Sequence, residues 1–335
     1  MNSNRSTAGT QDTPTNSIST PRAATAGKSS HYDRNFEQSL IDHGIYPNNR
    51  AQKPNNWKEI NDRIAQPRPS LSLPRFSDGV FETFQQTNEE ALSEGKVMRT
   101  VFPIFSGTAN VPNEGGLLFT NLEPLTDGTL VDARPDYYDG ARPEQIDKRV
   151  RDELESVIIP STMQHAPCLP NLFVEGKGPD GSPAVAKRQA CYDGALGARG
   201  INMLHSYGTD AETMYDNNAY TISSTYHHDG LLKMYTHHLT QPKAPGGEPE
   251  YHMTQLGAWA LTGSPEQFRQ GASAFRNARD WTKEQRDELI TAANGRVGNM
   301  PIETSALESS SYSMLSPSTN ENALLESDTS ADELS

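Results

Sequence analysis

The chain has 335 residues and a formal net charge of −14 at pH 7, and 34% of its residues are hydrophobic. Its two cysteines exclude a disulfide framework, and no apolar run is long enough for a membrane-crossing helix or a secretory signal. We therefore expect an intracellular protein without membrane contact, in either the nucleus or the cytoplasm.

The two ends of the chain differ from its centre. Residues 1–30 and 296–335 are rich in Ser, Thr and Asn, and the second is also acidic, so both are predicted to be disordered tails open to protein partners. The tails hold four bases and eight acids, which leaves 25 bases and 35 acids between them. This acidic balance argues against non-specific binding along nucleic acid but allows a local basic groove.

Residues 31–75 are predicted to form a helical arm packed on the main domain. Apolar residues at helical spacing predict a helix from Phe36 that stops at Gly44. A second helix is begun by Asn55–Asn56 and ended by Pro67. The main domain, 76–295, then opens with a helix capped by Ser77 or Asp78 and closed near Gly95.

Short apolar stretches follow this helix. Val97–Phe105 either finishes the helix or begins a strand, and Leu117–Leu122 and Thr129–Tyr138 are predicted strands. Pro135 near the end of the second strand indicates an edge or a bulge. A further helix opens at Pro143 and carries its apolar residues on one face.

The second half of the domain alternates strands and helices. Asn171–Pro179 predicts a strand running into a turn, and Ala184–Leu204 predicts a helix. Three glycines in this helix, three residues apart, suggest a closely passing backbone, because each costs about 1 kcal/mol relative to alanine. Ala219–Tyr226 and the segment after Asp229–Gly230 form a hairpin, and Tyr251–Ala293 reads as one or two helices. This order predicts a mixed α/β domain.

Acidic and basic side chains stand at the ends of two predicted strands. Asp136 follows Pro135, and Glu175-Gly176-Lys177 ends the later strand. The two-residue period of a strand places Glu175 and Lys177 on one face. Mg²⁺ is a hard cation that needs only one or two protein carboxylates beside phosphate oxygens and water. Asp136, Glu175 and Lys177 are therefore candidate residues for a divalent-metal site.

This arrangement resembles the PD-(D/E)XK nuclease-like superfamily over residues 76–295. The resemblance implies a restriction-endonuclease-like sheet core, Mg²⁺ or Mn²⁺ held by Asp136 and Glu175, and Lys177 assisting the attacking water. Gln189 and Tyr192 on the following helix stand where some branches carry a Gln and a Tyr that hold substrate or water. The chain is also similar to a group of uncharacterised fungal proteins that share the blocks 53–57, 138–145 and 186–200, a likeness that implies no activity.

Two features bear on whether the metal site assembles. Asp136 and Glu175 are 39 positions apart, so the helix from Pro143 must be an insertion that leaves their strands adjacent. A glutamate from the first helix supports the metal in some relatives, and Glu89, Glu90 and Glu94 all remain candidates.

Each site residue also has an ordinary structural interpretation. Asp136 fits a turn, Glu175 and Lys177 fit a solvated pair on an edge strand, and Gln189 and Tyr192 fit plain helix positions. The histidine pairs 227–228 and 237–238 are expected to be exposed on the hairpin, since two histidines alone make no zinc site.

We expect a Mg²⁺- or Mn²⁺-dependent nuclease acting on DNA or RNA. The alternative is a catalytically inactive binding or scaffold protein that keeps the fold, which the acidic composition and the two tails favour.

Overall fold

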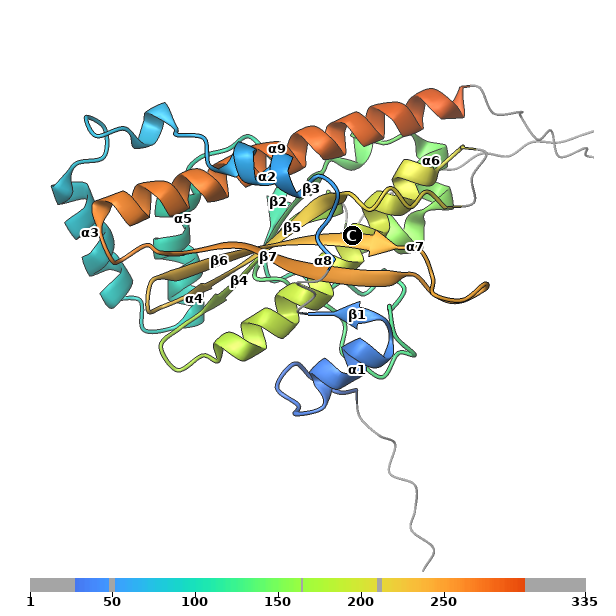
Figure 1. The fold of residues 1–335 in the computed structure, drawn as a ribbon, viewed down its shortest axis with the longest axis horizontal. Helices are drawn as coiled ribbons and strands as arrows, with labels where there is room; N and C mark the ends of the chain where they lie inside the picture. The colour runs from blue at the N-terminus through green and yellow to red at the C-terminus, as the bar shows by residue number, and fades with distance from the viewer. Residues whose placement is uncertain (1–27, 48–51, 164, 210–212, 299–335) are drawn as a thin grey trace, which may run out of the picture. The chain divides into compact units, whose positions relative to one another are not determined.

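The computed structural model describes residues 28–47, 52–163, 165–209 and 213–298 (Figure 1). The predicted disorder of 1–27 and 299–335 lies outside the described residues. Regular structure extends a short way into each predicted tail. Ser29 forms a bridge to Leu130, and the last helix continues to Val297.

In the described part of the chain, seven strands form one mixed sheet (Figure 1). The strand order is β1-β7-β6-β5-β4-β3-β2; β4–β5 and β1–β7 are parallel and the other neighbours antiparallel. With helices flanking it, this sheet confirms the predicted α/β class with a mixed sheet core and extra terminal helices. The strands are β1 Ile45–Tyr46, β2 Asn113–Glu114, β3 Tyr137–Ala141, β4 Cys168–Lys177, β5 Ala219–His227, β6 Leu231–Thr240 and β7 Glu250–Ala260.

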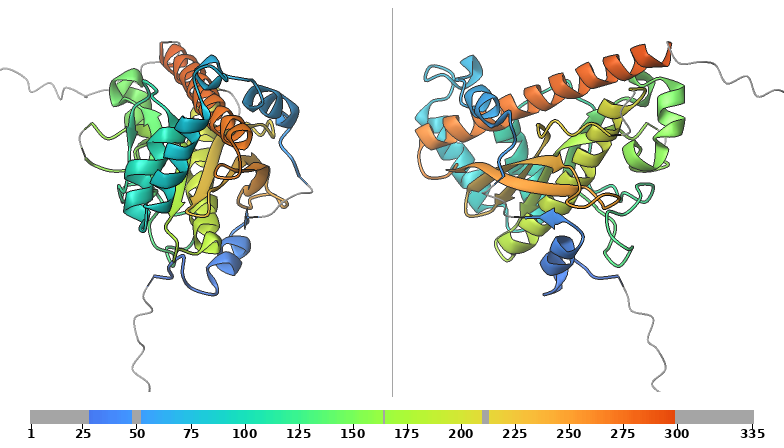
Figure 2. Two further views of the ribbon diagram at one scale, coloured as in Figure 1. Left: turned by 90° about the vertical axis from the view of Figure 1, so that its left-hand side faces the viewer. Right: turned by 45° about the vertical axis from the view of Figure 1, so that its right-hand side comes forward.

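Two long helices, α8 (Pro183–Ser206) and α9 (Pro265–Val297), lie on opposite faces of the sheet (Figures 1 and 2). The predicted arm is divided between the two faces. Its second part, from α2 to η1, packs with α9 and with the segment from α3 to α5, whereas α1 packs with α8. The other helical segments are α1 Phe36–Asp42, α2 Trp57–Ile64, η1 Pro69–Leu71, α3 Asp78–Glu89, α4 Glu94–Lys96, η2 Val97–Val101, α5 Phe102–Ser106, η3 Pro143–Gln145, α6 Lys148–Glu153 and α7 Glu155–Ile158.

The alternation of side chains along β4 determines on which face of the sheet its charged residues lie. Leu172 and Val174 belong to the apolar cluster on the α9 side, whereas Phe173 packs in the cluster on the α8 side. Because successive strand residues point to opposite faces, Glu175 and Lys177 follow Phe173 to the α8 side. The sheet face beneath α8 therefore holds the charged end of β4.

The strands that carry Asp136 and Glu175 are direct neighbours. β3 and β4 pair antiparallel, with Tyr137 opposite Val174 and Tyr138 opposite Phe173. The segment with η3, α6 and α7 leaves the sheet between the two strands and returns to it. It is thus an insertion in the connection, as the expected site requires, and not a crossover.

Several predicted elements differ from the structure. Residues 117–122 form no strand, and the strand expected over 129–138 begins only at Tyr137, because Pro135 cannot donate to a ladder. Val97–Phe105 is helical. The first part of the expected terminal helix is instead β7, which pairs with β6 over ten residues. Its tyrosine, threonine and tryptophan favour a strand once an open neighbouring edge is present.

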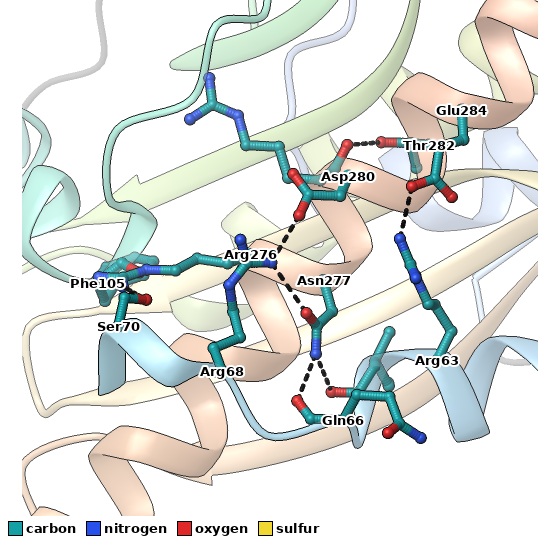
Figure 3. A network of polar contacts seen from close by, with 12 residues as sticks. Arg63, Gln66, Arg68, Ser70, Phe105, Arg276, Asn277, Asp280, Thr282 and Glu284 are labelled. Atoms are coloured by element: carbon teal, nitrogen blue, oxygen red, sulfur yellow. Dashed lines mark hydrogen bonds and ion pairs between the residues drawn. The ribbon is translucent and has the colours of Figure 1, made fainter. Parts of the chain in front are cut away.

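The N-terminal arm is fixed to α9 by buried and half-buried polar contacts (Figure 3). Arg68 donates to Asn277 Oδ1 at 2.9 Å and to Asp280 Oδ2 at 2.6 Å. The Asn277 amide donates in turn to the backbone oxygen of Gln66 at 2.7 Å. A buried amide satisfied from two sides specifies one docking geometry for the arm.

The glycines of α8 allow neighbouring segments to pack closely on the helix, as predicted. Only some of these close contacts are with a passing backbone, and others are with side chains. A Cβ at Gly197 would lie 2.7 Å from the Pro170 oxygen, but one at Gly194 would lie 2.2 Å from the imidazole ring of His237. His237 is buried and hydrogen-bonded to Ser223 at 2.7 Å, and burial lowers its pKa to about 3. His238 is also buried. The expectation of exposed histidines at 237–238 is therefore wrong, because α8 covers His237, and His238 on the opposite face of β6 packs against His252 of β7.

Replacing Gly194 with alanine should destabilise the protein by about 1–3 kcal/mol, the usual cost of overpacking, since the added methyl would overlap the buried His237 ring, which Ser223 holds by a hydrogen bond. Gly79→Ala in α3 is the matched control, because among the described residues no atom beyond its chain neighbours and its own helix backbone lies within 4 Å of its Cβ position. That change should stabilise the protein by up to about 1 kcal/mol through helix propensity. Urea unfolding of both variants checks the pair, and equal effects would contradict this packing account.

Candidate functional site

Asp136 and Lys177 lie at the same edge of the sheet, where β3 begins and β4 ends. The Gly176 N–H donates to Asp136 Oδ2 at 2.8 Å, and the Asp136 N–H points to Glu175 Oε1 at 3.4 Å. Gly176 itself faces the other side, where a Cβ would meet the Met98 sulfur at 2.6 Å. The residues of the two sequence motifs are thus brought together by the β3–β4 pairing.

The Lys177 ammonium lies among the carboxylates. Its Nζ is 2.9 Å from Glu94 Oε2, 3.7 Å from Asp136 Oδ2 and 3.6 Å from Glu175 Oε2, and its side chain is 2% exposed. Burial alone lowers the pKa of Lys177, but these carboxylates outweigh it and raise the pKa above its usual value. Lys177 is therefore a charged, fixed cation, and the solvated-pair interpretation does not describe it.

Of the three helix glutamates left open by the sequence, Glu94 reaches the site. Ser93 caps α4 by accepting from the Lys96 N–H, so the chain turns at Glu94. The turn after β4 passes close by, since a Cβ at Gly178 would lie 2.9 Å from the Glu94 nitrogen. Glu89 and Glu90 are exposed on the preceding turn.

Asp193 on α8 is a site residue that the sequence reasoning missed. It is 1% exposed, and its carboxyl lies within hydrogen-bonding reach of the Glu175 carboxyl. Burial raises the pKa of Asp193 to about 7 and that of Asp136 to about 6, and it raises the pKa of Glu175 well above its usual range. One available signal was spacing, since Asp193 stands one helical turn after Gln189.

The two predicted helix residues have different surroundings. Gln189 presents a buried Oε1 atom that has no hydrogen-bond partner within the described part of the chain. Tyr192 instead packs in the apolar cluster on the α8 side, edge-on to Phe36, with its hydroxyl near the Leu125 backbone. The structure therefore places Asp193, rather than Tyr192, beside Glu175.

His31 lies close to this site and was also not foreseen. Its ring packs against Phe36 at 4.4 Å between ring centroids, with the two planes tilted by 44°, and it is 8% exposed. Burial, together with the charges of Lys177 and Arg188, lowers the pKa of His31 to about 4. The His31 imidazole is therefore neutral at pH 7, and no sequence pattern marked it because its packing depends on the arm.

Two observations limit what the site can hold in this arrangement. Among residues 28–47, 52–163, 165–209 and 213–298, no group of three or more His, Cys, Asp or Glu side chains is positioned to hold a metal ion. The place between the carboxylates is taken by the Lys177 ammonium. A groove of about 920 Å³ lies elsewhere, between the arm, β7 and α9, and its lining includes none of the predicted site residues.

The family described as "Domain of unknown function (DUF7924)" matches residues 84–293. This span includes every site residue named above except His31. No curated protein and no solved structure matches the chain. In the described residues, no helix has the length and apolar character needed to cross a membrane.

Proposed function

The chain belongs to the DUF7924 family, and we propose that its site hydrolyses phosphodiester bonds of DNA or RNA with Mg²⁺ or Mn²⁺. The observation that carries this proposal is the meeting of Asp136, Glu175 and Lys177 at one sheet edge. Their resemblance to the PD-(D/E)XK superfamily supports it, as does the order in which β3, β4, α8 and β5 follow one another.

The carboxylates suit a hard divalent cation in donor type and charge. Asp136 and Glu175 already approach one common cation, the Lys177 ammonium, at 3.7 and 3.6 Å. Glu175 Oε2 is buried and has no hydrogen-bond partner in the described structure. A bound Mg²⁺ would supply Lewis-acid activation of water and neutralisation of phosphate charge. Asp136 and Glu175 would hold it, with oxygen ligands only.

Lys177 supplies fixed positive charge beside the reacting phosphate. Its ion pairs with Glu94, Asp136 and Glu175 keep the ammonium protonated against the opposing effect of burial, and they orient it. A preorganised cation stabilises the negative charge that develops on phosphate oxygens, at no reorganisation cost. The same ammonium can donate to the attacking water and orient it.

The local charge distribution supports nucleic acid as the substrate, although the net charge of the chain is −14. The two elements that flank the site both carry bases: Lys96 and Arg99 follow Glu94, and Lys187 and Arg188 stand in the first turns of α8. Basic side chains on both flanks can neutralise backbone phosphates. DNA and RNA fit this argument equally.

The test is metal-dependent cleavage of labelled single-stranded DNA, duplex DNA and RNA by the full-length protein. Cleavage should stop in EDTA and return with Mg²⁺ or Mn²⁺. Asp136→Asn should lower the rate at least about tenfold, because an amide oxygen replaces a charged ligand. Asp180→Asn, an exposed neighbour in the turn after β4, should leave the rate unchanged. EDTA-resistant cleavage would contradict the proposal.

A second candidate function is a binding or scaffold protein without catalysis. The observation favouring it is that the Lys177 ammonium, paired with Glu94 at 2.9 Å, fills the site in the described structure. In this case the charged cluster stabilises the sheet edge, and protein partners bind elsewhere. Full-length protein that cleaves none of the three substrates and binds no Mn²⁺ would favour this candidate.

A further inference from the structure

The groove of about 920 Å³ between the arm, β7 and α9 is separate from the charged site. Its apolar lining includes Leu71 and Leu73 of the arm, Leu256 and Trp259 of β7, and Ala274 of α9. The Leu73 side chain is 71% exposed. Among the described residues, none that line the groove belongs to β6. The groove therefore lies at the edge of β7 that faces away from β6.

This edge of β7 is open over its second half. On this side β7 pairs only with β1, at 251–252, in the part of the chain that the structure describes. Just beyond β7, the Leu261 N–H donates toward β6, to the Gly230 oxygen at 2.7 Å. Because the backbone groups of successive strand residues alternate in direction, Ala258 and Ala260 direct theirs away from β6. Both alanines are exposed, so their N–H and C=O groups are available to a further strand.

The charged residues of the groove already have partners within the protein. Arg68 pairs with Asp280 at 2.6 Å (Figure 3), and Arg269 pairs with Glu266 at 2.8 Å. A ligand that brought a further charge into the groove would compete with these pairs. The groove therefore favours apolar side chains on a backbone that hydrogen-bonds to the strand edge.

We propose that the groove binds an extended peptide segment of a partner protein, which adds a strand to the open edge of β7. Alternate side chains of this strand point to the same face, so apolar residues at every second position fill the groove between η1 and α9. The open length, 255–260, corresponds to a strand of about 20 Å. A second copy of the chain fits less well, because it carries the same net charge of −14 and its own arm beside its own β7.

The experiment selects binders for the full-length protein from a phage-displayed library of random peptides of about eight residues, enough to cover the open edge. A selected peptide with apolar residues at alternate positions is then labelled with fluorescein and titrated by anisotropy. Ala258→Pro should weaken its binding at least about tenfold, because proline removes an N–H that β6 does not use. Leu73→Asp should weaken it at least about tenfold as well, because the peptide would bury the new carboxylate.

Leu92→Asp is the matched control, since Leu92 is also 71% exposed and does not line the groove. It should change the affinity less than about twofold. Far-UV circular dichroism checks each fold, and Leu73→Asp decides the test if Ala258→Pro does not fold. Failure to select any peptide, or unchanged affinity in folded Leu73→Asp, would overturn the inference. A dimer in size-exclusion chromatography that Ala258→Pro or Leu73→Asp converts to a monomer would also overturn it, because a second copy would then occupy the edge.

Discussion

Replacing Asp139 with alanine should lower the free energy of unfolding by about 3–5 kcal/mol, the usual cost of removing one partner of a buried ion pair. Asp139 accepts from Arg279 Nε at 2.7 Å and from the same guanidinium through a second nitrogen at 2.9 Å. The two side chains are 1% and 5% exposed. The variant would leave the Arg279 guanidinium buried without its carboxylate.

A second buried guanidinium increases this effect. Arg286 is 1% exposed and hydrogen-bonds to the neutral side chain of Asn171. Among the negative charges that raise the pKa of Arg286 against the effect of burial, that of Asp139 has the largest influence. Together these contacts attach α9 to β3 and β4, the strands that carry the candidate site.

The measurement is urea unfolding of Asp139→Ala beside Asp152→Ala. Asp152 pairs with Lys148 four residues earlier on exposed α6, so its loss should cost less than about 0.5 kcal/mol. Similar losses in the two variants would show that the Asp139–Arg279 pair does not anchor α9.

Replacing Lys177 with methionine should lower the rate of phosphodiester cleavage by about 10²–10³-fold, the range typical for loss of one preorganised charge-stabilising donor. Methionine keeps the length and fills the same buried space without the ammonium. Mn²⁺ binding should persist or tighten, because the ammonium no longer competes for Asp136 and Glu175. The variant thus separates catalysis from metal binding.

Lys148→Met is the control, since Lys148 is an exposed lysine on α6 that forms an ion pair with Asp152. It should reduce the cleavage rate less than about threefold. A Lys177→Met enzyme that cleaves at the wild-type rate would exclude Lys177 from the reaction. If Lys177→Met abolishes Mn²⁺ binding as well, the ammonium is needed to assemble the site and its catalytic role is not supported.

Much of the central sheet and the sequence-local part of the site could be predicted. Glu175 and Lys177 share a face because a strand has a period of two, and that rule needs no tertiary information. Pro135 and Asp136 were predicted near the end of a strand over 129–138, whereas β3 begins only at Tyr137, so the neighbouring strand was predicted but its bounds were wrong. The hairpin of β5 and β6 followed from Asp229–Gly230, a turn whose chemistry is local.

The missed parts depend on packing between distant segments. Asp193 lies at the site because α8 packs against the strands. Its position along a predicted helix does not reveal that its side chain faces the Glu175 carboxyl. Of the three candidate glutamates, Glu94 reaches the site because the chain turns at Ser93 and Gly178 passes close to it. β7 was mistaken for a helix because its strand character depends on the open edge of β6.

The most direct test of the central claim is titration of Mn²⁺ into full-length wild-type protein and into Glu175→Gln by calorimetry. The site described here predicts saturable binding in the wild type that is lost or weakened at least about tenfold in Glu175→Gln, since the buried ligand loses its charge. No binding in the wild type, or equal binding in both proteins, would contradict a metal site at Asp136 and Glu175.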